Sequence, residues 1–121
     1  MMTRPLTSLE QALISKLLSV PFLGREELQE QAATASVRVN DDPLDSSILL
    51  AVDPSSPRGH VIYRVPVDAS APDSDGVRID FLLHVAEGWI SELEIYRVDG
   101  EPVRQMPDPA SLNVVVYPIQ G

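Results

Sequence analysis

The sequence predicts an α+β fold, with two N-terminal helices packed on one face of a mostly antiparallel, meander-like sheet of about five strands. Apolar residues recur at helical spacing near the N-terminus, and from Ser36 onward they alternate with polar residues at a period of two. Helices that precede consecutive strands, instead of alternating with them, favour segregated layers. The 121 residues suit a single domain over residues 1–121.

Two helices are expected before the strands. Thr7 and Glu10 have the spacing of a capping box, in which the hydroxyl and the carboxylate each bind a free amide of the first turn. A helix over residues 7–20 follows, and Pro21 ends it because proline lacks the N–H that another turn needs. Its buried stripe is Leu9, Leu13 and Leu17. Acidic residues in the first turn favour a second helix over residues 25–33.

Alternation and turn residues place the strands. The expected strands are residues 36–40, 46–53, 60–67, 77–85, 89–98 and 113–117. A turn over residues 41–43 closes the first of them. Residues 68–76 are rich in Pro, Ser, Asp and Gly, and we expect them to form an exposed loop.

The strongest pattern is a hairpin with its turn at residues 86–88. A two-residue loop would place Phe81 opposite Glu94, with a carboxylate against the apolar row. A three-residue loop with Gly88 in the left-handed conformation places Phe81 opposite Leu93 and gathers the apolar residues on one face. Because a slip of one residue exchanges the two faces, burial favours the three-residue loop.

This register puts a polar row on the face opposite the helices. The row consists of Asp80, Leu82, His84, Ile90, Glu92, Glu94 and Tyr96. Asp80 would lie opposite Glu94, and like charges directly opposite each other destabilise a sheet. Arg78, Arg64, a bound cation, raised carboxylate pKa values or solvent could relieve that pair. The candidate binding residues are Leu82, His84, Ile90 and Tyr96.

Catalytic ingredients are sparse. His84 with Asp80, Glu92 and Glu94 is the candidate acid–base or metal-dependent site, because carboxylates can orient and charge-stabilise an imidazole. The sequence has no serine elbow, phosphate-binding glycine loop or dinucleotide fingerprint. With two histidines and no cysteine, a multi-histidine or thiolate zinc site is excluded within one chain. We therefore expect no metal and no cofactor, and the sequence favours a non-enzymatic protein without deciding the matter.

Two further features have simpler structural interpretations. Asp73–Gly76 resembles the start of a calcium loop, but the later acidic ligands do not follow at the right spacing, which favours a turn. Trp89, at the start of a strand, is expected to anchor the core and not to stack on a ligand.

Charge and composition exclude several classes of binding partner. The formal net charge is -9, and the basic residues are scattered singly, so neither nucleic acid nor an anionic membrane is an expected partner. No apolar run approaches the length of about 20 residues that spans a bilayer. The absence of cysteine excludes disulfides and suits a cytoplasmic protein.

Several segments are similar to a family of short, uncharacterised bacterial proteins, found especially in high-GC actinobacteria. The hairpin carries the most specific match, with the pattern LLHV-x-x-G-x-x-SELEIY over residues 82–96. The other matching segments are residues 4–7, 22–28, 99–102 and 107–109. Leu23 stands where the family pattern has proline, and residues 41–46 replace cysteine-rich turns. The resemblance implies a shared fold and no established activity.

The expected function is a small, soluble, non-enzymatic module that binds a protein or small ligand through the polar sheet face, with a homodimer through that face as one form. Two alternatives stay open. One is a small enzyme or metal-dependent site centred on His84. The other is an acidic inhibitor or immunity-type protein that binds a basic partner, an alternative that the net charge alone suggests.

Overall fold

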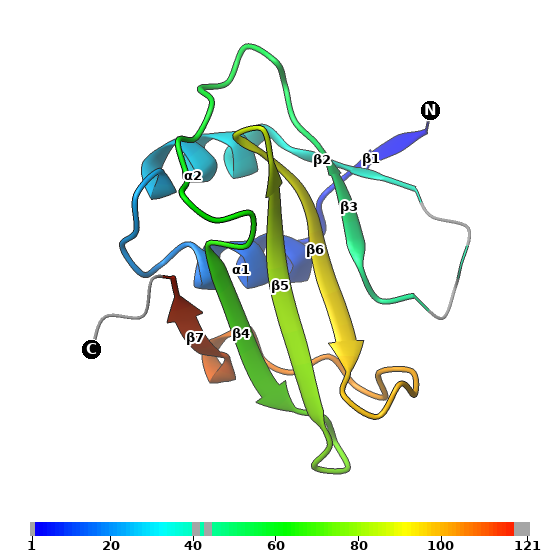
Figure 1. The fold of residues 1–121 in the computed structure, drawn as a ribbon. Helices are drawn as coiled ribbons and strands as arrows, with labels where there is room; N and C mark the ends of the chain where they lie inside the picture. Colours follow the sequence, from blue (N-terminus) through cyan, green and yellow to red (C-terminus); the bar gives the residue numbers. More distant parts are fainter. Residues whose placement is uncertain (1, 40–41, 43–44, 118–121) are drawn as a thin grey trace.

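The computed structural model describes residues 2–39, 42 and 45–117, and it shows two helices on one side of an antiparallel sheet (Figure 1). The helices precede most of the strands in the chain, as segregated layers require. The predicted α+β class is confirmed. The described residues form more strands than the five expected.

The sheet joins two antiparallel meanders edge to edge. Its strands in chain order are β1 (Thr3–Pro5), β2 (Ser36–Arg38), β3 (Ile48–Ala51), β4 (Val67–Pro72), β5 (Arg78–Ala86), β6 (Trp89–Arg97) and β7 (Asn113–Val116). Within the described residues the spatial order is β1-β2-β3-β6-β5-β4-β7. The pairing of β3 with β6 joins the first three strands to the others, so it holds the two halves of the sheet together.

Helix α1 (Ser8–Leu17) begins at the predicted capping box. The Thr7 hydroxyl accepts a hydrogen bond from the Glu10 amide at 3.1 Å, and the Glu10 carboxylate accepts one from the Thr7 amide at 2.8 Å. The helix ends three residues earlier than expected, before Pro21 is reached. Helix α2 (Arg25–Thr34) matches its predicted range closely, and a 3-10 turn, η1 (Pro109–Ser111), precedes the last strand.

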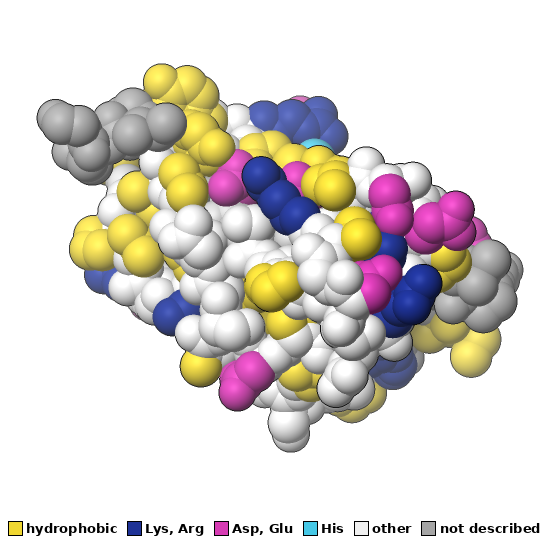
Figure 2. All heavy atoms as spheres, turned by 90° about the horizontal axis from the view of Figure 1, so that it is seen from below, with side chains coloured by type: hydrophobic (Ala, Val, Ile, Leu, Met, Phe, Trp, Pro, Cys, Tyr) yellow, Lys and Arg dark blue, Asp and Glu magenta, His cyan; other side chains and the backbone are white. Residues whose placement is uncertain are grey.

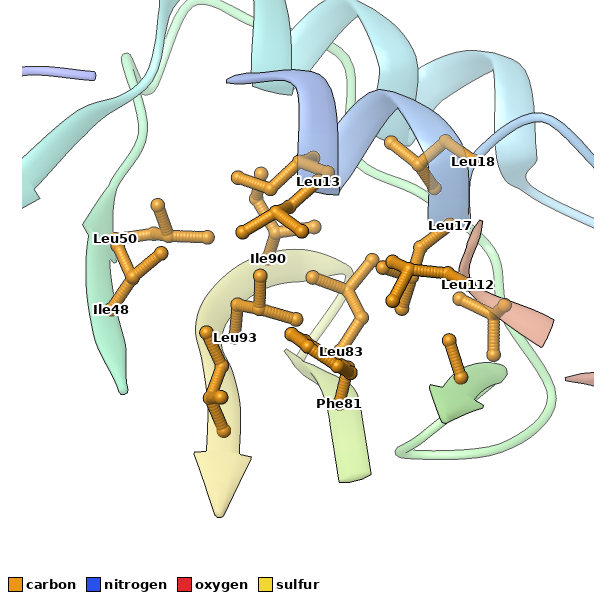
Figure 3. Packing of buried hydrophobic residues seen from close by; sticks show 14 of the residues in the cluster. Leu13, Leu17, Leu18, Ile48, Leu50, Phe81, Leu83, Ile90, Leu93 and Leu112 are labelled. Atoms are coloured by element: carbon orange, nitrogen blue, oxygen red, sulfur yellow. The ribbon is translucent and has the colours of Figure 1, made fainter. Parts of the chain in front are cut away.

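The core lies between α1 and the sheet (Figure 3). Leucines on one side of α1 point towards β3, β5 and β6, as the 3.6-residue period requires. The largest buried side chains include Phe81, Leu13, Leu17, Leu83 and Leu93. Trp89 is only half-buried and lies outside this cluster, so the expectation that it anchors the core is wrong.

The predicted strand over residues 60–67 is wrong, and the predicted loop over residues 68–76 is right only for residues 73–76. The strand is β4, which begins at Val67 and occupies the first part of the expected loop as far as Pro72, so residues 73–76 form the turn to β5. Ala69 and Ala71 alternate with polar residues and face the core, but their small size and the neighbouring proline resemble loop composition. Pro66 lacks an N–H, and residues 60–66 form no regular ladder before it.

Three other strand boundaries differ from prediction. The strand β1 was not expected, because it has three residues and ends at a proline. The strands β2 and β3 are shorter than their predicted ranges of 36–40 and 46–53. The predicted turn over residues 41–43 lies outside the described residues, Asp42 excepted.

The hairpin turn is a two-residue loop, so the predicted three-residue loop is wrong. Ala86 pairs with Trp89 across Glu87 and Gly88, which have φ values of 52° and 88°. A bulge in β6 then shifts the register, and Phe81 pairs with Ile95. The observed register differs from the predicted one by two residues, and an even shift leaves each side chain beyond the bulge on the same face.

The bulge changes the position of one candidate residue. Ile90 precedes the register shift and is 1% exposed, so its predicted place on the polar face is wrong. Phe81, beyond the bulge, is fully buried as expected, and His84 projects from the opposite face. The bulge therefore lets a tight turn coexist with an apolar row that continues along both strands.

A buried glutamine links α2 to this turn through hydrogen bonds. The Gln31 amide nitrogen donates to the carbonyls of Pro57 and Gly88 at 2.7 Å and 2.8 Å, and its oxygen accepts from the Ile90 amide at 2.9 Å. The backbone is packed so closely here that a Cβ at Gly88 would come within 2.7 Å of the Gly59 carbonyl oxygen. Gln31 thus bonds to backbone groups of two segments, and the Gly88 carbonyl also accepts a hydrogen bond from the Gly59 amide.

Replacing Gln31 by leucine is expected to lower the free energy of unfolding by about 1–3 kcal/mol, because the buried Ile90 amide and the Pro57 carbonyl lose their side-chain partner. Urea denaturation followed by circular dichroism measures the change. Gln11→Leu, at an exposed position of α1, is the matched control and should change stability by less than about 0.5 kcal/mol. Equal losses in the two variants would contradict the bridging role of Gln31.

Candidate functional site

The face of β4, β5 and β6 that points away from the helices carries most of the predicted polar row. We name it the acidic face, and it consists of Asp68, Asp80, Leu82, His84, Glu92, Glu94 and Tyr96. These positions alternate with the buried core residues of the same strands. The cross-strand pairs of Asp68 with Leu82 and of Leu82 with Glu94 place Leu82 at its centre.

Asp80 does not lie opposite Glu94, as the predicted register required. Its partner across the ladder is Tyr96, whose hydroxyl donates to the Asp80 carboxylate at 3.2 Å. The Arg78 guanidinium donates to the same carboxylate at 2.6 Å. Partial burial, and then the Asp80 carboxylate, raise the pKa of Tyr96 above its ordinary value. Asp80 is therefore held by two neighbours on its own face.

His84 contacts one carboxylate of the predicted catalytic set. Its Nε2 lies 2.8 Å from a Glu94 oxygen, although its direct cross-strand partner is Glu92. Its Nδ1 is buried and has no hydrogen-bond partner among the described residues. The Glu92 side chain makes no hydrogen bond or ion pair with any residue that the structure describes. The geometry thus supplies one histidine–carboxylate contact, with Asp80 bonded elsewhere.

The described residues of the acidic face form no cluster that could bind a metal ion. Among the side chains that the structure describes, no three or more His, Asp or Glu residues are grouped as metal ligands would be. The alternation of the strands explains this, because each carboxylate projects from a separate position of a rigid ladder. Neither α1 nor α2, the α-helices of the described chain, has the length and apolar character that crossing a bilayer requires.

A pocket of about 350 Å³ adjoins Leu82, and sequence reasoning missed most of it. Its lining residues are Tyr63, Arg64, Val65, Asp68, Leu82 and Tyr117. The Tyr117 hydroxyl donates to the Asp68 carboxylate at 2.6 Å, and this bond is the main cause that raises the pKa of Tyr117. Tyr63 is well exposed. The alternation pattern of the sequence assigned Tyr63 to a strand over residues 60–67, so it did not predict that Tyr63 lines a pocket.

The acidic turn at Asp73–Gly76 surrounds an arginine. The buried Arg97 guanidinium contacts the carboxylates of Asp73, Asp75 and Asp99 at 2.9 Å, 3.1 Å and 2.7 Å. Figure 2 shows acidic and basic side chains interleaved at this end of the molecule. A positive charge from the chain itself thus occupies the place that a calcium-loop interpretation would give to a cation.

Hydrogen bonds hold these carboxylates in their charged form. Although burial opposes ionisation of Asp73, backbone amides, led by that of Arg104, and then the Arg97 guanidinium keep its pKa far below the ordinary range. The bond from Arg97 lowers the pKa of Asp99 to about 2. The cluster therefore joins the β4–β5 turn to the segment after β6 and is structural in character.

A domain of unknown function, DUF6984, matches residues 3–107 of the chain. The chain belongs to this family. The match begins at β1 and ends before η1, so it includes the hairpin and both helices. No curated protein and no solved structure matches the chain. Membership in DUF6984 is consistent with the expected uncharacterised family and assigns no activity.

The Arg97 cluster predicts acid-sensitive stability. The folded pKa of Asp99 is about 2, against an ordinary value of 3.8, so its contribution is complete above about pH 5 and is lost as the pH falls through 3.8 towards 2. Asp99→Asn should lower stability at pH 7 and flatten the loss of stability between pH 4 and 2. Thermal melts across this pH range measure both effects.

Glu30→Gln is the control for this experiment, because Glu30 is exposed and has no partner among the described residues. It should preserve both the stability at pH 7 and its decline on acidification. An Asp99→Asn variant with an unchanged acid profile would show that the cluster does not couple folding to pH.

Proposed function

We propose that this DUF6984 protein is a non-enzymatic binding module whose acidic face docks a protein partner that presents basic residues around one apolar side chain. The observation that carries the proposal is the arrangement of carboxylates around an apolar centre. Asp68, Asp80, Glu92 and Glu94 surround Leu82 on the face of β4, β5 and β6 that the helices leave uncovered. Complementary charges around a buried anchor are a recurrent form of protein recognition.

The charges of the face support a cationic partner. Glu92 has no partner among the described residues, and Glu94 is bonded only to His84. Arg78 neutralises Asp80, and Arg64 is the one basic residue in the lining of the neighbouring pocket. Carboxylates therefore outnumber guanidiniums, and a basic partner would gain favourable interactions on approach.

The pocket beside Leu82 supports an apolar anchor. It is a shallow, open hollow of about 350 Å³, and Leu82, Val65 and two tyrosine rings offer apolar contact to one large side chain lying on it. Asp68 lies in the same lining, so a basic neighbour of the anchor would meet a carboxylate. Tyrosine is enriched at interfaces because its ring and hydroxyl serve apolar and polar contacts together.

A homodimer through this face is less well supported. Self-association would bring the same carboxylates against their copies, in a chain of net charge -9. Catalysis by His84 has weaker support too, because Glu94 is the one carboxylate among the described residues that bonds to the imidazole. The absence of cysteine fits our proposal that the module acts in the cytoplasm. An actinobacterial origin stays a prediction from residues 82–96.

The test uses a synthetic peptide with one leucine flanked by lysines, and a second peptide with glutamates in place of the lysines. The lysine peptide is expected to shift amide resonances of β4–β6 in an NMR titration, and added salt should weaken it. The double variant Glu92→Gln/Glu94→Gln should raise its dissociation constant by about five- to tenfold, because each lost charge pair contributes modestly.

The double variant Glu30→Gln/Glu101→Gln is the matched control, because it removes the same charge from exposed positions away from the acidic face. It should bind the lysine peptide almost as the unmodified protein does. Equal binding of the glutamate peptide, or shifts confined to α1 and α2, would refute the proposal. A concentration-dependent dimer that Leu82→Glu abolishes would favour self-association instead.

A further inference from the structure

A second pocket lies where β3 and β6 separate, away from the pocket beside Leu82. The two strands pair at Ile48 with Leu93 and at Leu49 with Glu92. Beyond that point the bulge in β6 displaces Ser91, and β6 curves away from β3 (Figure 1). Bulges commonly redirect side chains beside functional sites. The resulting pocket has a volume of about 380 Å³.

The lining combines apolar walls with few polar groups. Its residues are Arg38, Leu50, Val52, Pro54, Ala86, Trp89, Ile90 and Ser91. Such a composition, with a volume in the range of about 300–1,000 Å³, is typical of small-molecule sites. The indole of Trp89 is half-buried, so part of this flat surface is free to contact a ligand.

The basic residues at this pocket lack internal partners. Arg38 forms no ion pair with any residue in the described part of the chain, and it is exposed. Arg58 stands over the Trp89 ring, 5.8 Å from its centroid, and likewise has no carboxylate partner there. By contrast, the ion-paired arginines are Arg4, Arg25, Arg78, Arg97 and Arg104.

Unpaired guanidiniums are notable in a chain with twice as many acidic as basic residues. A carboxylate could have neutralised Arg38, as happens at Arg4 and Arg78. Glu92 is the nearest acidic residue along β6, and it does not line this pocket. The charge of Arg38 is therefore available to a ligand.

We propose that this pocket binds a small monoanionic molecule with a flat apolar ring and a carboxylate group. The ring would pack against the Trp89 indole and the apolar walls, and the carboxylate would meet Arg38. The planar guanidinium matches a carboxylate in a two-pronged hydrogen-bonded pair. One lining guanidinium in a strongly acidic protein suits a single negative charge better than a phosphate dianion.

The experiment compares phenylacetate with 2-phenylethanol, which has a similar ring and no charge. Trp89 is the single tryptophan of the chain, so its indole N–H gives one NMR signal that reports on this pocket. Phenylacetate is expected to shift that signal and to bind at least about tenfold more tightly than the alcohol. Equal affinities of the two compounds in the unmodified protein would overturn the proposal.

Variants locate the charge that recognises the carboxylate. Arg38→Gln should remove the preference for phenylacetate over the alcohol, and Arg38→Lys should retain part of it. Arg64→Gln is the matched control, because it removes another unpaired arginine that lines the pocket beside Leu82. An unchanged preference in Arg38→Gln, or its loss in Arg64→Gln, would refute the assignment. Should Arg38→Gln fail to fold, the comparison of ligands in the unmodified protein still decides.

Discussion

The β5–β6 turn and its attachment to α2 constrain the rest of the structure. Glu87 and Gly88 are both left-handed, which makes the turn as short as a hairpin allows. Gln31 then bonds to the turn itself at Gly88 and to the start of β6 at Ile90. Since β5 and β6 lie at the middle of the sheet, this attachment sets which side chains meet the helices and which form the acidic face.

The hairpin shows what the sequence could and could not predict. Alternation in two runs determines the parity of the register, and parity alone places Phe81 in the core and His84 outside it. The shorter loop shifts the register by one residue and the bulge shifts it by one more. Residues beyond the bulge therefore lie on the same face in the predicted register and in the observed one. Only the residues between turn and bulge distinguish them, and there Ile90 and Trp89 were assigned to the wrong environments.

The prediction for residues 60–72 was wrong for a different reason. Strands are predicted from alternating large apolar side chains, and residues 60–67 carry more of these side chains than residues 67–72. The structure instead uses small residues in β4, where Ala69 and Ala71 are buried beside Val67. Residues 60–66, which carry the larger side chains, form irregular backbone, and Tyr63 in this segment therefore lines a pocket. No local signal in the sequence reveals this exchange, because it depends on how closely α1 approaches the strand.

The charges of the chain are distributed unevenly along β6. Arg97, at its end, collects three aspartates, and this internal neutralisation keeps part of the acidic excess from acting on other molecules. Trp89, at its start, lies beside guanidiniums that pair with no carboxylate of the described residues. Between them Glu92 and Glu94 face outward. Since the ion-paired end is already satisfied, the free charge of the sheet is concentrated at its middle and at the turn end, with opposite signs. A rigid ladder keeps these two charges apart, which allows one small sheet to offer two chemically different binding surfaces.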